Sequence, residues 1–444
     1  MTLFGTDGIR GRYGEYPLDD STIPNIGYAI SRSFNDKTIK KIFIAHDGRE
    51  SSNILCQKII EGIFYDREYQ IIYLGLFPTP ALTFILSQNS HLDAIGIEIT
   101  ASHNPYSDNG IKVFDKLGFK ITFEQEAMIE KILGEQLHDV SKTSFDLSIN
   151  NSTRELYIKF ISELVHSETK LSHKLRIAVD CANGAMSNII SEIQWPENIS
   201  LTLFNHSPDG KNINHQCGAV HPEYLLNIIL DSRDSKKSDN FDFGVCFDGD
   251  GDRAIIVSNS GNILDGDDLL YLFSFQSKEN KKVVGTVMTN YGIRKNLEKN
   301  GIDFLETDVG DKNVLQSIIN NHAFIGAESS GHIIHTNIAG IPIGDGLVTM
   351  IKFIHLLYGL DNNINAIYPT SLKIPSKLIN IESMSPADFL KKNQLIFSKV
   401  EKILKNNGRI LVRKSGTQSL IRVLIEHESS QILRDAEKII KSIS

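Results

Sequence analysis

Little in this 444-residue sequence indicates a secreted, zinc–thiolate or membrane protein. Its four cysteines are widely scattered and form no C-x-x-C pair: Cys56, Cys181, Cys217 and Cys246. That spacing disfavours a zinc site and is typical of reduced thiols rather than of a disulfide framework. No apolar run approaches the roughly 18 residues that cross a bilayer, and the polar N-terminal residues do not resemble a signal peptide. We therefore expect a cytoplasmic protein with no membrane partner.

A surplus of positive charge is also missing. The chain has 46 Lys and Arg residues against 54 Asp and Glu residues, which gives a formal net charge of −8. Because binding to a polyanion requires a basic surface, we expect no nucleic-acid partner. A small phosphorylated ligand is compatible with this charge, since it needs only a local basic pocket.

Short β-branched runs alternate with longer amphipathic segments along most of the chain. Residues 41–46 are a predicted strand, for example, and residues 51–65 are a predicted helix. This rhythm predicts largely parallel or mixed sheets covered by helices. It restarts after a polar stretch at 138–153 and after Arg253, and the pattern changes from about Ile367. Because the chain is too long for one core, we predict three similar α/β units and a smaller C-terminal α+β unit.

A serine follows the apolar run 94–99 in the segment Thr100-Ala-Ser-His-Asn-Pro105. Asn104-Pro105 prevents direct continuation into a helix. A serine at the end of a strand is where an α/β enzyme presents a nucleophile, although most such segments are simple turns. Ser102 is therefore a candidate nucleophile that needs support from other segments.

Three carboxylates alternate with glycines in Phe247-Asp-Gly-Asp-Gly-Asp-Arg253, directly after a predicted strand. Asp248, Asp250 and Asp252 would repel one another unless a cation lay between them, and hard oxygen ligands favour Mg²⁺. An EF-hand is excluded, because Arg253 and Asn259 stand where its glycine and glutamate belong. A dinucleotide loop is disfavoured, because a strand follows where a helix should begin. Metal binding is the best interpretation.

Further polar loops have chemistry suited to a sugar phosphate. Arg413-Lys-Ser-Gly-Thr417, with Arg422 beyond it, combines hydroxyl, backbone and guanidinium donors for a phosphate, although a plain hairpin connection is also possible. Gly326-Ala-Glu-Ser-Ser-Gly-His332 collects groups that can read sugar hydroxyls. Phe4-Gly-Thr-Asp-Gly-Ile-Arg-Gly11 is a predicted glycine-rich loop, and Lys112 stands shortly after Ser102.

Together these loops resemble the hallmark regions of the α-D-phosphohexomutase family. The resemblance runs from Leu3 to about Val423 in the order and spacing of that family, and four motifs in order are very specific. Val179-Asp-Cys-Ala-Asn-Gly-Ala185 and Val309-Gly-Asp-Lys312 are similar to the branch that acts on glucosamine phosphates. The substrate assignment rests less on Ser329, because serine is not the commonest residue there.

The resemblance implies four domains around a central cleft. Three would be related α/β domains, and the last would be an α+β domain of the TATA-box-binding-protein-like type. The predicted ranges, each contributing one loop to the cleft, are 1–152 with the phosphoserine loop, 153–255 with the metal loop, 256–366 with the sugar-recognition loop and 367–444 with the phosphate-binding loop.

The resemblance also implies roles for individual residues. Ser102 would carry a phosphoryl group, and Mg²⁺ would be held by Ser102, Asp248, Asp250 and Asp252. The substrate-binding residues would be Arg253, Glu328 and Ser330, with Arg413, Ser415, Gly416, Thr417 and Arg422 on the phosphate that does not react. The candidates for handling protons or charge are Lys112, Arg10, His103 and His332.

Two departures from the family pattern bear on affinity rather than on phosphoryl transfer. Gln418-Ser419 replaces the usual Glu-Pro after the phosphate loop, and the loss of proline would loosen that loop. Lys312-Asn313 replaces the usual Arg-Tyr, which keeps a positive charge but loses the bidentate guanidinium.

The function implied by the resemblance is interconversion of glucosamine 6-phosphate and glucosamine 1-phosphate. Glucosamine 1,6-bisphosphate would be the intermediate and activator, and the product would supply UDP-N-acetylglucosamine and peptidoglycan. The alternatives are a mutase acting on glucose or mannose phosphates, a Mg²⁺-dependent phosphatase and a non-catalytic sugar-phosphate-binding protein. The family also implies a monomer or homodimer.

Overall fold

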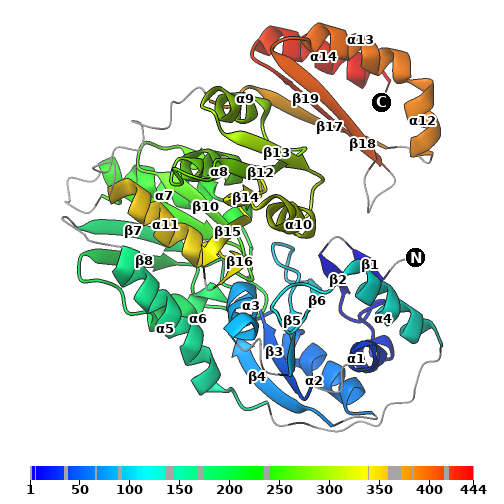
Figure 1. The fold of residues 1–444 in the computed structure, drawn as a ribbon, viewed down its shortest axis with the longest axis vertical. Coiled ribbons are helices and arrows are strands. Elements are labelled where there is room, and N and C mark those ends of the chain that lie inside the picture. The colour runs from blue at the N-terminus through cyan, green and yellow to red at the C-terminus, as the bar shows by residue number, and fades with distance from the viewer. Residues whose placement is uncertain are drawn as a thin grey trace.

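The computed structural model contains four β-sheets in chain order, each with its own helices (Figure 1). It describes residues 3–5, 7–34, 39–65, 68–88, 93–135, 145, 147–168, 174–234, 240–338, 340–358, 372–382, 385–414 and 420–443. We call the parts built on the first three sheets the first, second and third units, and the part built on the last sheet the C-terminal unit.

The first unit has a six-stranded mixed sheet in the order β1-β2-β6-β5-β3-β4. Its strands are β1 (Phe4–Gly5), β2 (Gly8–Arg12), β3 (Lys41–His46), β4 (Gln70–Leu76), β5 (Ala94–Ile99) and β6 (Asp108–Phe114). Its helices are α1 (Thr22–Ser33), α2 (Ser52–Ile63), α3 (Thr79–Gln88) and α4 (Phe123–Glu135).

The second and third units each have a five-stranded mixed sheet. The second contains α5 (Asn151–Glu168), β7 (Leu175–Asp180), α6 (Met186–Glu192), β8 (Ile199–Phe204), a 3₁₀ turn (Gly218–Val220), α7 (Glu223–Asp234), β9 (Phe243–Phe247), β10 (Ala254–Ser258) and β11 (Ile263–Leu264). The third contains α8 (Gly266–Ser274), β12 (Lys282–Thr286), α9 (Tyr291–Lys299), β13 (Asp303–Thr307), α10 (Asp311–Asn321), β14 (Ile325–Ala327), β15 (Ile333–Ile338), β16 (Ile341–Gly344) and α11 (Gly346–Tyr358).

The three α/β units share one strand plan. Each has a parallel trio with the first strand of the βαβ run in the middle, namely β4-β3-β5, β8-β7-β9 and β13-β12-β14. Antiparallel strands then extend the sheet beyond the last member of each trio. The turns after β5, β9 and β14 therefore occupy equivalent places, and these turns carry Ser102, the aspartates and Glu328.

One large apolar core joins these three units. It contains buried side chains from α3, β7, β9, α8, β14 and α11, so one face of each sheet packs toward it. Separate clusters with α1 and α2, with α7 and with α10 cover the opposite faces. The shared core holds the turns that follow the strands in a fixed arrangement.

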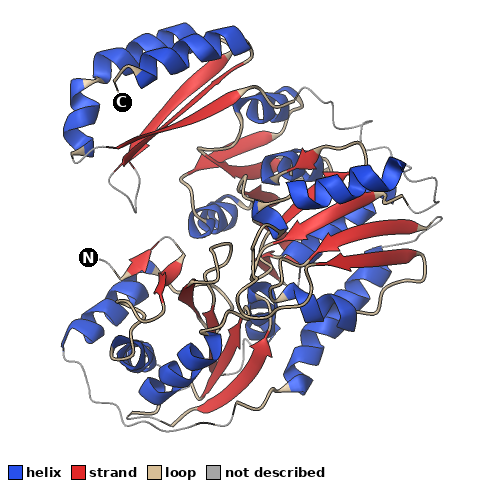
Figure 2. Ribbon diagram, turned by 180° about the vertical axis from the view of Figure 1, so that it is seen from behind, coloured by secondary structure: helices blue, strands red, loops and turns tan. Residues whose placement is uncertain are grey.

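The C-terminal unit has a three-stranded antiparallel sheet in the order β17-β19-β18. Its elements are β17 (Ser376–Glu382), α12 (Pro386–Lys392), α13 (Gln394–Leu404), β18 (Gly408–Lys414), β19 (Leu420–His427) and α14 (Ser430–Lys441). Helices α13 and α14 pack on the strands around a separate apolar core (Figure 2).

Two details differ from the sequence predictions. Residues 4–11, predicted as a loop, contain β1 and β2, which form a short antiparallel hairpin. The second sheet extends past the boundary predicted after residue 255, because β10 pairs with β9 along its whole length. The metal loop is thus a hairpin connection within the second unit. The boundary predicted after residue 366 lies outside the described residues.

In the described part of the chain, no helix is long and apolar enough to traverse a bilayer. All four cysteines are free and buried.

Candidate active site

Ser102 lies in the turn between β5 and β6 and is fully buried. Its φ of 51° is left-handed, an uncommon conformation for a residue other than glycine. The Thr100 hydroxyl accepts a hydrogen bond from the Ser102 amide at 2.7 Å. The Ser102 carbonyl accepts one from Arg49 and one from Asn214, both at 2.8 Å. These contacts fix the direction in which the hydroxyl points.

Arg49 stabilises the serine loop, which we define as residues 100–108. Its guanidinium also donates to the carbonyls of Pro105 and Asp108, and its Nε lies 2.8 Å from Asp47 Oδ2. Only 2% of Arg49 is exposed, so these bonds form away from competing water. In the sequence, a role for Arg49 is indicated only by its position shortly after β3, the strand that pairs in parallel with β5.

The metal loop between β9 and β10 brings three aspartates together. One carboxylate oxygen from each of Asp248, Asp250 and Asp252 lies within 4.8 Å of the others, and all three residues are buried. Ser102 Oγ donates a hydrogen bond of 2.7 Å to Asp248 Oδ2. Glycine is required at 249, because a Cβ there would stand 2.6 Å from the Ser102 carbonyl oxygen. Ser102 and the acidic triad therefore lie next to each other.

The acidic triad has the chemistry of a site for a hard cation. Oδ1 of Asp250 and Oδ1 of Asp252 are buried without a hydrogen-bond partner among the described residues. Burial, together with repulsion from Asp252 and Asp250, raises the pKa of Asp248 well above its usual range. Thr79, the first residue of α3, donates its hydroxyl to Asp250 Oδ2 at 2.6 Å. Carboxylate oxygens without a hydrogen-bond partner in the described structure and mutual repulsion both fit a divalent ion.

Two basic side chains partly balance the triad. Lys112, on β6, places Nζ 2.8 Å from Asp250 and 3.2 Å from Asp252. Burial opposes its charge, but Asp250 and the other carboxylates outweigh burial and raise the pKa of Lys112 well above its usual range. Arg253 Nε lies 3.7 Å from Asp248. Lys112 therefore acts in this arrangement as a fixed positive charge.

The two candidate histidines have opposite electrostatic environments. His103 Nδ1 lies 3.3 Å from Ser102 Oγ, and burial, reinforced by Arg253, lowers the pKa of His103 to about 4. His332 Nδ1 lies 3.6 Å from Asp252. Burial opposes its charge, but Asp252 prevails and raises the pKa of His332 to about 9. At neutral pH His103 is therefore neutral and His332 is charged.

Asp7 in the N-terminal hairpin connects Arg10 to this cluster. Asp7 Oδ2 accepts from Arg10 at 2.6 Å and lies 3.2 Å from Lys112 Nζ. Its Oδ1 pairs with Lys120, which follows β6. Burial opposes ionisation of Asp7, but Lys112 and Lys120 lower its pKa well below the usual range. Neither Asp7 nor Lys120 was expected in the site, although Asp7 belongs to the N-terminal motif.

The predicted sugar-recognition loop follows β14 in the third unit. Glu328 Oε1 accepts from the amide of Gly310, directly before α10, at 2.8 Å. Ser330 lies in the turn between β14 and β15. His332 forms an isolated bridge with Arg253, which ties this turn to the metal loop. A backbone contact thus connects the sugar-recognition loop to the metal loop.

The predicted phosphate loop is only partly described. Arg413 and Arg422 lie directly opposite each other on β18 and β19, and the Nε atoms of both are buried without a hydrogen-bond partner among the described residues. Within the described ranges, no hydrogen bond or ion pair joins either arginine to the acidic triad. The predicted contacts Ser415, Gly416 and Thr417, and also Gln418-Ser419, lie outside the described residues.

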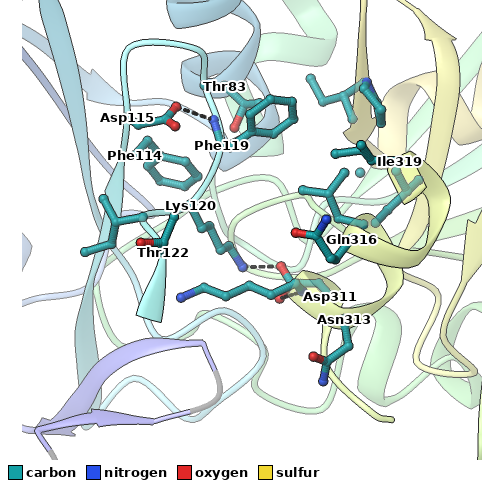
Figure 3. Close-up of a pocket in the computed structure, with 18 of the residues that line it drawn as sticks. Thr83, Phe114, Asp115, Phe119, Lys120, Thr122, Asp311, Asn313, Gln316 and Ile319 are labelled. Carbon is teal, nitrogen blue, oxygen red and sulfur yellow. Dashed lines mark hydrogen bonds and ion pairs between the residues drawn. The ribbon is translucent and has the colours of Figure 1, made fainter. Parts of the chain in front are cut away.

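A cavity of about 480 Å³ adjoins the cluster between the first and third units. Asp252 and His332 line it, together with apolar side chains such as Phe114 and Ile319. Figure 3 shows Lys120 reaching across this cavity to Asp311 at the start of α10.

Sequence models of one enzyme family match the chain in four consecutive parts. The α/β/α domains I, II and III of phosphoglucomutase/phosphomannomutase match residues 1–138, 155–261 and 265–372, and the C-terminal domain matches residues 378–441. The chain belongs to this family. The family resemblance and the predicted fold class are confirmed. The chain is an isomerase, as phosphohexomutases are.

Relatives and solved structures agree with this assignment. A phosphoglucosamine mutase from Pseudoalteromonas translucida is 34% identical over 98% of the chain and 96% of that relative. A phosphoglucomutase/phosphomannomutase family protein from Burkholderia thailandensis has a similar fold, with a TM-score of 0.78 at 21% identity, covering 100% of this chain and 96% of that one. N-acetylphosphoglucosamine mutase from Aspergillus fumigatus, solved with GlcNAc-6P and magnesium, has a TM-score of 0.67 at 17% identity, covering 99% and 95%.

Proposed function

We propose that this phosphohexomutase interconverts glucosamine 6-phosphate and glucosamine 1-phosphate, with Ser102 as the phosphoryl carrier. The observation that carries the proposal is the 2.7 Å hydrogen bond from Ser102 Oγ to Asp248 in the acidic triad. The preference for an amino sugar is supported by the names of the curated relatives, which are phosphoglucosamine mutases.

Mg²⁺ is the metal that fits best, because the donors are hard carboxylate oxygens. Asp248, Asp250 and Asp252 would hold it together with an oxygen of phosphorylated Ser102. When bound, the ion would neutralise charge on the phosphoryl group during transfer. The magnesium in the Aspergillus fumigatus structure supports this choice.

The proposed reaction moves one phosphoryl group at a time. The bond from phosphorus to Ser102 Oγ breaks, a bond to the sugar 1-hydroxyl oxygen forms, and the hydroxyl proton ends on Ser102. The 1,6-bisphosphate then turns over. The bond from the 6-phosphorus to the sugar O6 breaks, a bond to Ser102 Oγ forms, and the serine proton ends on O6, which leaves glucosamine 1-phosphate. Arg253 and Arg10 would stabilise negative charge during both transfers. Neutral His103 would relay the proton, a role supported by the 3.3 Å between its Nδ1 and Ser102 Oγ.

The arginines of the C-terminal unit would bind the phosphate that is not being transferred. Arg413 and Arg422 carry like charges on directly opposite strand positions, and their buried Nε atoms have no partner within the described residues. An anion between them would relieve that repulsion. Glu328 and Ser330 would contact the sugar hydroxyls.

A coupled assay with glucosamine, glucose and mannose 6-phosphates tests the proposal. We expect the highest kcat/KM with glucosamine 6-phosphate and a Mg²⁺ requirement. Ser102→Ala should abolish turnover, whereas Ser107→Ala, a matched change in the same loop, should retain it. A preference for glucose or mannose 6-phosphate would contradict the amino-sugar assignment. Inorganic phosphate released at the rate of sugar-phosphate consumption would indicate a phosphatase instead.

A further inference from the structure

We propose that Lys120 is a positioning residue for phosphoryl transfer, acting through Asp7 to fix Arg10 and Lys112 against the third unit. This inference rests on the proposed function. It follows from a line of alternating charges that crosses all three α/β units.

The local structure places Lys120 with little freedom. Residues 115–119 form a tight turn after β6, closed by a hydrogen bond of 2.8 Å from the Asp115 amide to the Phe119 carbonyl. Gly118 has a φ of 84°, and a Cβ there would lie 2.4 Å from the Thr83 carbonyl oxygen. The turn reverses the direction of the chain, so that the backbone of Lys120 pairs with that of Phe114 in an antiparallel β-bridge. Its side chain, 12% exposed, therefore reaches a defined point.

At that point Lys120 binds two carboxylates from different units. Its Nζ pairs with Asp7 Oδ1 in the N-terminal hairpin and with Asp311 Oδ2 at the first turn of α10. The side chain of Asp311 is itself held in place within the third unit, because its Oδ1 also accepts a hydrogen bond of 2.8 Å from the Lys312 amide. Lys120 thus fixes the position of the Asp7 carboxylate relative to the third unit.

The other oxygen of Asp7 is used by the reacting cluster. Asp7 Oδ2 binds Arg10 at 2.6 Å and lies 3.2 Å from Lys112 Nζ. Lys112 in turn contacts Asp250 and Asp252. Without Lys120, Asp7 Oδ1 loses its ion-pair partner, and the carboxylate is no longer linked to Asp311 of the third unit. Arg10 and Lys112 would still meet Asp7 Oδ2, but that oxygen would no longer be held at one position relative to the third unit.

The chain offers a matched control in Lys312. Its Nζ pairs with Glu126 on α4, so this bridge joins the same two units. Its side chain is 15% exposed, close to the value for Lys120. Neither Lys312 nor Glu126 contacts Asp7, Arg10 or Lys112 in the described structure. A role limited to docking the units would make the two lysines equivalent.

The experiment compares Lys120→Met, Lys120→Arg and Lys312→Met with the wild type, using kcat and KM for glucosamine 6-phosphate with Mg²⁺. We expect Lys120→Met to lower kcat about 10-fold or more with a smaller change in KM, because small misplacement of reacting groups is costly. Lys120→Arg should recover most of the loss. Lys312→Met should change kcat by less than about threefold, as expected for a simple ion pair. Because Lys312 stands at a position that bears on affinity, its KM is not used as a control value, and the comparison rests on kcat alone.

Two further measurements distinguish an effect through Asp7 from a general weakening of the contact between the units. If Lys120 acts through Asp7, the double variant Asp7→Asn/Lys120→Met loses no more activity than Asp7→Asn alone. Additive losses of activity in the double variant, or equal losses of kcat in Lys120→Met and Lys312→Met, would overturn the inference.

Hydrogen exchange in residues 4–12 gives a readout that does not depend on enzyme activity. It should accelerate in Lys120→Met and not in Lys312→Met, and an unchanged hairpin would also overturn the inference. Failure of the wild type to turn over any hexose phosphate would refute the proposed function instead.

Discussion

At the scale of single residues, Ser102 is positioned by side chains that lie far from it in the sequence. Asn214, in the second unit, donates from Nδ2 to the carbonyls of Ser102 and Asn104 at 2.8 and 3.2 Å. Asn214 itself has a φ of 56°, which asparagine tolerates better than most residues. The second unit therefore supplies part of the support for a loop in the first.

Asn214→Asp tests this support while keeping the shape of the side chain. The change replaces an amide donor with a carboxylate that faces two carbonyl oxygens, so the serine loop should shift. We expect kcat to fall about 10- to 100-fold, because displaced reacting groups lose alignment. Asn212→Asp, in the same loop, is the control, since Asn212 Nδ2 donates to Ser207 and not to the serine loop. An equal response of both variants in a steady-state assay would argue against the positioning role.

The residues inside the motifs could be found from the sequence, whereas their supports could not. Ser102 and the three aspartates stand out because the segments after two strands concentrate unusual chemistry within a few positions. Arg49, Asn214 and Lys120 have ordinary local sequences. Their roles arise from contacts over 53, 112 and 191 positions, which no local pattern encodes.

At the scale of elements, the strands were predictable because β-branched runs are bounded by clear turn signals. The pairing of β10 was not, since a strand after a glycine-rich hairpin looks like the start of a new unit. Its register with β9, Ala254 opposite Phe247, closes the metal loop and forces the three aspartates into one turn. The N-terminal hairpin was hidden for a similar reason, because β1 has only two residues.

The packing of β15 on α11 predicts an acid-sensitive element. His335 Nε2 lies 3.0 Å from Thr349 Oγ1, and burial lowers the pKa of His335 to about 3. Above its unfolded pKa of about 6.5, neither state binds a proton there. As pH falls below that value, the unfolded state binds the proton first, so stability is lost between pH 6.5 and 3.

His335→Gln should remove this sensitivity while keeping a polar partner for Thr349. Between pH 7 and pH 5, the wild type should lose about 2 kcal/mol more unfolding free energy than the variant. Urea unfolding at the two pH values measures the difference. His206→Gln, an exposed loop position, should respond as the wild type does. Identical pH responses of His335→Gln and the wild type would show that His335 carries no such penalty.

At the scale of the whole molecule, the site depends on how separate units meet. The first three units share one apolar core, which holds the serine and metal loops together. The C-terminal unit has its own core and contacts the third unit through a few polar links, among them Arg409 to the Thr289 carbonyl and Asn290 to Ile374. The sequence predicted four units from rhythm and family motifs. It could not predict these contacts, because polar contacts between units leave no periodic pattern.

The central claim is that Ser102 carries the phosphoryl group between the two positions of the sugar. It is tested most directly by mass spectrometry of dephosphorylated protein incubated with Mg²⁺ and glucosamine 1,6-bisphosphate. We predict that the protein gains the mass of one phosphoryl group, that peptide mapping places it on Ser102, and that glucosamine monophosphate forms in equal amount. Ser102→Ala should gain none. A phosphoryl group on another residue, or sugar monophosphate formed without protein phosphorylation, would contradict the claim.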